Sequence, residues 1–242
     1  MTFTLNEGFW KPGNSGPNRS IDFTSASSQK FTMSKANFGV LNTKKWTYHV
    51  WFKRRSIGGV TKYLFTTTSP NLMEIKITGA NVLDIIVRNG AGSAIGRLVT
   101  NAAYTDTANF HQLVIYWDSA NATSADRLRL YVDQTRVTSF STETQPSLNA
   151  DMWNNTTTYC IGSDNSSGFY YDGQLYSYAF IDNQSPDIST LHDSGSPIDL
   201  RGATGLFSLL HTTDSSTLED DEVLATNWTN TNTVIKSTDI PA

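Results

Sequence analysis

The chain has 242 residues, which suits one large β-sandwich or two small domains. Only 17% of the residues are charged and the net charge is −4, without a long basic or acidic run, so the sequence lacks the pattern of a nucleic-acid-binding protein. No apolar stretch is long enough to span a bilayer, and the first residues resemble no signal peptide, so we expect synthesis in a cytoplasm.

Residues 1–19 predict an extended N-terminal arm. They contain Pro12, Pro17 and three glycines, and they show no strand pattern. Phe9 and Trp10 are apolar side chains that suit a solvated arm poorly, so we interpret them as assembly contacts with a neighbouring chain. The alternative is that the arm folds back onto its own domain.

The next 80 or so residues contain several strand patterns. Strands are predicted at residues 20–23, 29–33, 46–53, 63–66, 73–77, 82–88 and 97–99, with Asn89-Gly90 as a hairpin turn. The run 46–53 alternates with the period of two that is typical of a strand. One face of it carries Trp46, Tyr48, Val50 and Phe52, and the other carries Thr47, His49, Trp51 and Lys53.

A three-stranded meander is predicted between residues 110 and 140, with strands at 111–118, 127–132 and 136–140. Leu128, Leu130 and Val132 alternate with polar neighbours and are expected to face inward. Asp133-Gln134 joins the last two strands. Because Gln at positive φ costs about 1 kcal/mol, we expect a longer or differently shaped turn there.

The remaining strands are predicted at residues 159–162, 169–182 and 206–210, with one helical turn between 185 and 192. Cys160 lies in an apolar run and is expected to be a buried free thiol. Trp228, Val234 and Ile235 offer apolar anchors in the tail. We therefore divide the chain into an arm (1–19), an all-β antiparallel jelly-roll sandwich (20–195) and an extension packed on or beside it (196–242).

Three runs carry a family resemblance: 46–53 (WTYHVWFK), 122–142 (ATSADRLRLYVDQTRVTSFST) and 170–182 (YYDGQLYSYAFID). They resemble concanavalin A-like lectin/glucanase domains of the laminin-G-like type, and in particular a variant found in tailed-bacteriophage particle proteins. One departure is the turn, where the family usually has Asn-Gly and this chain has Asp133-Gln134. The resemblance implies a non-enzymatic virion protein, a capsid or tail component that decorates the particle or attaches it to the host.

A sugar site needs a flat aromatic face beside amide or carboxylate partners. Loop residues that could supply both are Trp153, Asn154, Asn155, Asp164, Asn165, Tyr170 and Tyr171. Packing of the aromatic residues into the sandwich is the alternative for each of them. The resemblance also implies that calcium could bind, with Asp164, Asn165 and Asp172 as candidate donors, although such residues commonly form turns. No other cofactor is expected.

Catalysis has little support in the sequence. Retaining glucanases of this superfamily carry a Glu-x-Asp-x-x-Glu strand, whereas the one glutamate cluster here, 219–222, lies in a polar tail. His49, His111, His192 and His211 lack metal-ligand spacing. Three hypotheses remain: a virion structural protein, a free-standing carbohydrate-binding module, and a glycoside hydrolase. Expected partners are other virion proteins, copies of the chain in a homo-oligomer, and host surface polysaccharide.

Overall fold

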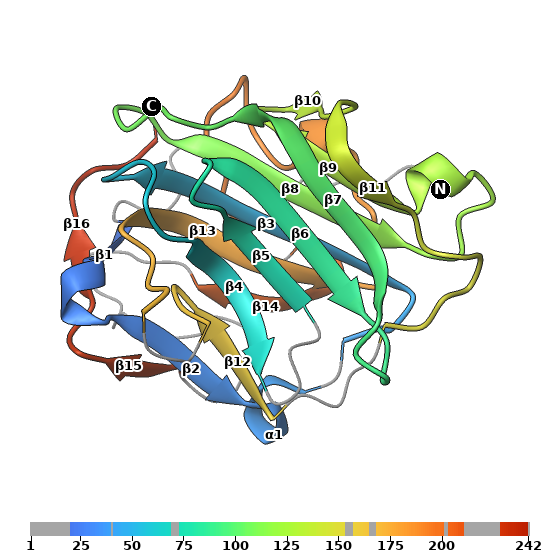
Figure 1. Ribbon diagram of the computed structural model, residues 1–242, viewed down its shortest axis with the longest axis horizontal. Coiled ribbons are helices and arrows are strands. Elements are labelled where there is room, and N and C mark those ends of the chain that lie inside the picture. The colour runs from blue at the N-terminus through green and yellow to red at the C-terminus, as the bar shows by residue number, and fades with distance from the viewer. Residues whose placement is uncertain are drawn as a thin grey trace.

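The computed structural model describes residues 20–39, 41–68, 73–152, 157–164, 168–200, 203–210 and 228–241. These residues form two antiparallel sheets packed face to face (Figure 1). The predicted all-β class is confirmed, and the arrangement is that of a jelly-roll sandwich. Among the described residues, helical structure is limited to α1 (Lys35–Phe38) and three short 3₁₀ turns, η1 (Ser25–Ser27), η2 (Ser124–Asp126) and η3 (Ile188–Thr190).

Sheet A has the strand order β10-β9-β8-β3-β13-β1-β16. β1 pairs with the beginning of β13, and β14 pairs with its later residues. Its strands are β1 (Ser20–Phe23), β3 (Lys45–Arg54), β8 (His111–Asp118), β9 (Leu128–Val132), β10 (Thr135–Arg136), β13 (Gly173–Asp182), β14 (Leu206–Leu210) and β16 (Ile235–Ser237).

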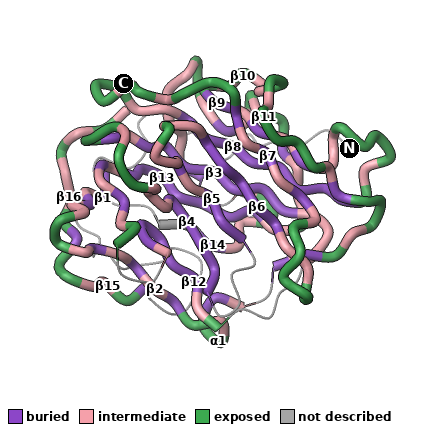
Figure 2. Tube along the Cα trace, in the orientation of Figure 1, coloured by how far each residue is buried: buried purple, intermediate pink, exposed green. Residues whose placement is uncertain are grey.

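Sheet B has the order β11-β7-β6-β5-β4-β12-β2-β15. Its strands are β2 (Lys30–Ser34), β4 (Lys62–Thr68), β5 (Met73–Ile77), β6 (Val82–Arg88), β7 (Ala94–Ala103), β11 (Phe140–Thr144), β12 (Thr158–Ile161) and β15 (Thr229–Thr231). Buried residues run along most of the strands of both sheets, and the exposed ones gather in the connecting loops (Figure 2).

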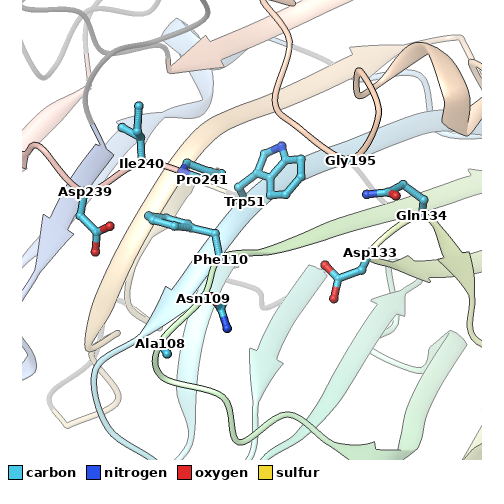
Figure 3. Close-up of a pocket in the computed structure, with 10 residues that line it drawn as sticks. All are labelled: Trp51, Ala108, Asn109, Phe110, Asp133, Gln134, Gly195, Asp239, Ile240 and Pro241. Carbon is cyan, nitrogen blue, oxygen red and sulfur yellow. The ribbon is translucent and has the colours of Figure 1, made fainter.

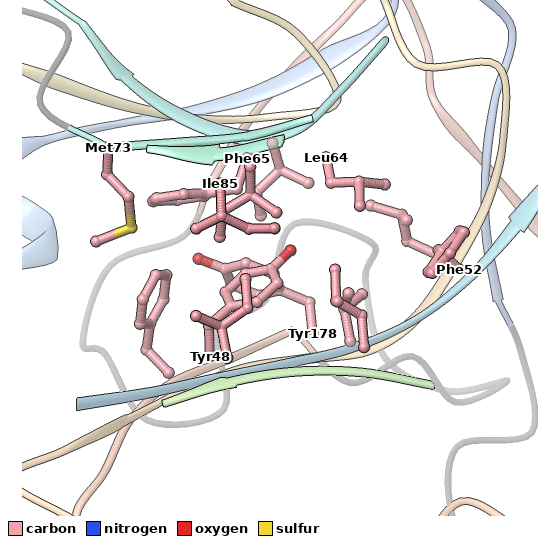
Figure 4. Packing of buried hydrophobic residues seen from close by; sticks show 14 of the residues in the cluster. Tyr48, Phe52, Leu64, Phe65, Met73, Ile85 and Tyr178 are labelled. Carbon is pink, nitrogen blue, oxygen red and sulfur yellow. The ribbon is translucent and has the colours of Figure 1, made fainter. Parts of the chain in front are cut away.

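Aromatic rings fill the space between the sheets. Tyr48 and Tyr178 of sheet A pack against Phe65 of sheet B, with ring centroids 6.0 Å apart in both contacts (Figure 4). Trp46 stacks on Trp117 at 6.1 Å. The face of β3 predicted to carry Trp46, Tyr48, Val50 and Phe52 is therefore the core face, and all four side chains are fully buried.

The central hairpin keeps its predicted facing but differs at its turn. Leu128, Leu130 and Val132 are buried as expected. Asp133 (φ 47°) and Gln134 (φ 62°) form a two-residue turn, so the expectation of a longer turn was wrong. The Asp133 carboxylate accepts a hydrogen bond from the backbone N–H of Gln112 at 2.9 Å, and its second oxygen lies 2.7 Å from His111 Nδ1. These contacts offset the cost of positive φ.

The predicted third strand of the meander is also wrong. β10 contains only two residues, after which the chain crosses to sheet B, where β11 pairs with β7. β7 is longer than predicted because it pairs with both β6 and β11. The closing strand begins at Gly173, later than predicted. A Cβ at Gly173 would lie 2.0 Å from the Lys53 carbonyl oxygen, so this close strand pairing requires glycine.

The C-terminal residues join the edges of both sheets. β15 pairs with β2 in sheet B, and β16 pairs with β1 in sheet A. Trp228 and Val234 are buried in the core as expected, whereas Ile235 is 53% exposed. Cys160 is a buried free thiol, as predicted. None of the described helices has the length and apolar character needed to cross a membrane.

We predict that Leu130→Ala lowers the free energy of unfolding by about 2–5 kcal/mol, because a fully buried side chain leaves a cavity between the sheets. Arg129→Ala, its neighbour on the outer face, should cost less than about 1 kcal/mol, since that partly exposed guanidinium lies over the Tyr116 ring at 4.6 Å from its centre. Denaturant titration measures both changes. Equal, small losses would contradict the assigned register of β9.

Candidate functional site: a cleft on the outer face of sheet A

The outer face of sheet A is partly covered by the chain that follows β13. Leu191 and Leu200 of this segment pack on Val114, Tyr116 and Ile181, away from the main core. The cover ends near Gly195, where a cleft of about 450 Å³ opens (Figure 3). Its lining combines aromatic, amide and carboxylate side chains with apolar ones: Trp51, Ala108, Asn109, Phe110, Asp133, Gln134, Gly195, Asp239, Ile240 and Pro241.

Trp51 lies in the floor of the cleft because it points outward from β3, the strand paired with both β8 and β13. The side chain is only 3% exposed, and its indole nitrogen Nε1 is buried without a hydrogen-bond partner. A buried indole N–H normally finds an acceptor. The indole N–H is therefore a buried donor without an acceptor.

Phe110 forms an aromatic wall directly before β8. The Lys53 ammonium lies 5.8 Å from the centre of the Phe110 ring, and Tyr176 meets this ring edge-on at 6.4 Å. The half-buried Phe110 thus combines a ring face with an adjacent positive charge. A pocket with aromatic walls and a few placed polar groups is the usual form of a small-ligand site.

The opposite wall is the Asp133-Gln134 turn, held by His111. The imidazole Nδ1 lies 2.7 Å from Asp133, and Nε2 lies 3.5 Å from Asp106. The hydrogen bond to Asp133 and the charges of the two carboxylates raise the pKa of His111, although burial opposes this. His111 thereby fixes a turn whose side chains line the cleft.

The described residues among those predicted for sugar binding do not line this cleft. Trp153, Asn154, Asn155 and Asn165 lie outside the described residues, as do the proposed assembly contacts Phe9 and Trp10. Asp164 and Tyr170 are half-buried. Burial raises the pKa of Tyr63 on sheet B, and the charge of Asp164 contributes to this increase. Tyr171 is 1% exposed, and its hydroxyl donates to the Lys53 carbonyl oxygen at 2.8 Å, so its ring cannot stack on a sugar.

The sequence did not predict that four residues would line one cleft: Trp51, Phe110, Gln134 and Asp239. The alternation of β3 did place Trp51 opposite the core face, and a tryptophan there was a usable signal. Nothing in the sequence joins it to Asp239, because β16 reaches this face by pairing with β1.

The described residues also contain a buried charged cluster on sheet B. Arg88 contacts Glu74 at 2.8 Å, Arg97 contacts Asp84 at 3.0 Å, and Lys76 pairs with both carboxylates. Burial alone would raise the pKa of Glu74, but hydrogen bonds from Lys76 and Arg88 outweigh it and hold the pKa below its usual value. This carboxyl group is therefore a poor proton donor near neutral pH.

Asp172, one candidate calcium ligand, is occupied by protein groups. Its oxygens accept hydrogen bonds from Ser56 at 2.6 Å and from Arg55 at 3.1 Å. In the described part of the chain, no three His, Cys, Asp or Glu side chains are grouped to hold a metal ion. The other candidates divide between Asp164, which is described, and Asn165, which is not.

Comparison with known families identifies the class of this protein. The model of a laminin-G-like family, described as the concanavalin A-like lectin/glucanases superfamily, matches residues 25–184. The match covers more than half of the chain, and the chain belongs to this superfamily. It contains a lectin-like domain. No curated protein sequence matches the chain.

Solved structures of similar fold include the native heptameric SAP-like pentraxin of Limulus polyphemus, with 12% identity, a TM-score of 0.54, and coverage of 93% of this chain and 96% of that one. The mouse laminin alpha1 domains LG4-5 align with 16% identity over 83% of this chain and 48% of theirs, with a TM-score of 0.48. The Ruminococcus gnavus IT-sialidase CBM40, bound to alpha2,3 sialyllactose, aligns with 14% identity over 64% of this chain and 85% of its own, with a TM-score of 0.46. At these identities the likeness concerns the fold alone.

The covered half of the outer face contains a buried histidine. His49 Nδ1 lies 3.0 Å from the Ser177 carbonyl oxygen, and Nε2 lies 3.1 Å from Gln112 Nε2, which also donates to the Leu191 carbonyl oxygen at 2.9 Å. A neutral ring protonated on Nδ1 satisfies both contacts. Burial lowers the pKa of His49 to about 4.

We predict that stability falls as the pH drops from about 6.5 towards 4. The folded pKa of His49 is below the unfolded value, so its contribution is complete above about 6.5 and is lost as the pH falls, by at most about 1.4 kcal/mol per pH unit. Denaturant titrations at several pH values in this range give the free energy of unfolding as a function of pH. This free energy should fall less steeply with decreasing pH in His49→Gln than in the parent.

The matched control for this prediction is His111→Gln. The pKa of His111 is raised, so its contribution is complete below about 6.5 and is lost at higher pH. In this variant the free energy of unfolding should therefore depend on pH differently from the parent above pH 6.5. An unchanged acid slope in His49→Gln would contradict the assignment.

Proposed function

We propose that this protein is a non-enzymatic component of a bacteriophage particle, part of the capsid or tail, that binds a host-surface saccharide in the cleft at Trp51 and Phe110. The observation that carries the saccharide part is the lining of this cleft. The aromatic wall at Phe110 lies beside the amides of Asn109 and Gln134 and the carboxylate of Asp133. Apolar sugar faces suit the rings, and hydroxyls suit the polar groups.

The particle part of the proposal is supported by the sequence runs at 46–53, 122–142 and 170–182, which resemble those of phage particle proteins. Host attachment by a repeated virion protein gains from multivalency, because many weak saccharide contacts act together. A cleft with modest affinity per site suits such a role.

The non-enzymatic part is supported by the sheet B carboxylates. Double displacement needs one carboxyl group as a proton donor and a second as a nucleophile. Glu74 and Asp84 are each paired with cations, and no oxygen atom of either one is left without a charged partner. Both groups are suited to cross-linking strands β5, β6 and β7.

We predict that Phe110→Ala weakens binding to the saccharides recognised on a glycan array by about tenfold or more, because an aromatic stacking surface is removed. Phe169→Ala is the matched control, since Phe169 is a partly exposed ring that packs near Tyr63 on sheet B. The same saccharides should release no new reducing ends on incubation. Equal binding by both variants would remove the cleft from consideration.

The alternative is a free-standing carbohydrate-binding module. The two hypotheses differ in whether the protein is found on phage particles. We expect purified phage particles to contain the chain in many copies by quantitative mass spectrometry, and gold-labelled antibody to decorate intact particles. Recovery of the chain only from the soluble lysate, with particles free of it, would favour the alternative.

A further inference from the structure

The chain that follows β16 lines one side of the cleft at Trp51 (Figure 3). We call residues 239–241 the strap. The Asp239 carboxylate accepts a hydrogen bond from Lys53 Nζ at 2.6 Å, and the Asp239 amide donates to Ser237 Oγ at 3.1 Å. Ile240 and Pro241 then line the cleft together with Trp51 and Phe110 (Figure 3).

The strap is attached weakly. Its ion pair is half exposed, with the Asp239 side chain 42% accessible, so water and salt screen it. Ile240 is 41% exposed, although it belongs to a cleft with aromatic walls. A short segment held in this way can leave its site at little cost.

The strap also leaves the floor of the cleft unsatisfied. The Trp51 Nε1–H is buried and has no partner, and the side chains of Ile240 and Pro241 contain no acceptor. A ligand oxygen atom that reached the indole would supply the missing acceptor.

Asp239 stands between two clefts. It lines the larger one and also a second of about 230 Å³, which Lys53, Arg55, Thr107 and Gln174 line with it. Arg55 is already paired with Asp22 and Asp172, whereas Lys53 is paired with Asp239. Moving Asp239 away would remove the residue that lines both clefts and free the charge of Lys53 beside Phe110.

We propose that the strap is a displaceable stand-in for the ligand, and that the natural occupant is an acidic saccharide whose carboxylate replaces that of Asp239 on Lys53. The sugar ring then lies against Phe110, and one of its oxygens accepts the hydrogen bond of the Trp51 indole. This inference rests on the proposed saccharide-binding function and specifies its ligand class.

The test uses the full chain and two variants that both break the ion pair. Asp239→Asn removes the competing carboxylate and keeps Lys53, whereas Lys53→Gln removes the cation that would bind the ligand. Hydrogen exchange by mass spectrometry reports the strap, and calorimetry reports binding of trigalacturonate and of a neutral galactotriose. Melting temperatures close to that of the parent show that both variants fold.

We expect exchange of the peptide around Asp239 to be at least tenfold faster in both variants. Asp239→Asn should bind trigalacturonate about tenfold more tightly than the parent and prefer it to galactotriose, with a preference that weakens as salt increases. Lys53→Gln should lose that preference. Equal binding of the acidic and neutral sugars by Asp239→Asn, or unchanged exchange, would overturn the inference and leave the proposed function standing. Absence of saccharide binding in all three proteins would overturn both.

Discussion

The packing of β3 between β8 and β13 is the constraint on which the rest of the structure depends. One face of β3 contributes four fully buried side chains to the core between the sheets. Because strand side chains alternate, the same register places His49, Trp51 and Lys53 on the outer face. A shift of one residue would bury Lys53 in the core and expose Phe52. Burial of one face of β3 in the core therefore determines which of its residues lie at the floor of the cleft.

The walls of the cleft come from segments that are distant in sequence. Asp133 and Gln134 belong to the turn after β9, Gly195 follows the cover over His49, and Asp239 follows β16. The turn after β9 is positioned because β9 pairs with β8, a neighbour of β3, and Asp239 is positioned because β16 is tied to β3 through β1 and β13. A binding surface assembled on a rigid sheet in this way can change its ligand through turns and edge segments while the core is preserved.

Local periodicity predicted the strands well and the long-range arrangement less well. The alternation in 46–53 and 128–132 is a local signal, and both facings are confirmed. The crossing after Arg136 and the strap over Trp51 depend on pairing between residues far apart, which no local pattern encodes. The turn at Asp133 was mispredicted because its stabilising partner, His111, lies 22 residues away. Trp153 and its asparagine neighbours in the predicted sugar site lie outside the described residues, so their role stays a prediction, whereas Tyr171 of that site is buried.

The central claim is that saccharide binds over Trp51, and the indole N–H of this residue reports it directly. The chain has six tryptophans, and comparison with Trp51→Phe assigns the Trp51 signal in a proton–nitrogen correlation spectrum. Titration with the tightest-binding oligosaccharide from the array should shift this resonance downfield in a saturable way, since a buried donor without a partner gains an acceptor. An unmoved Trp51 signal, with shifts confined to residues 153–167, would contradict the account and favour the site predicted around Trp153.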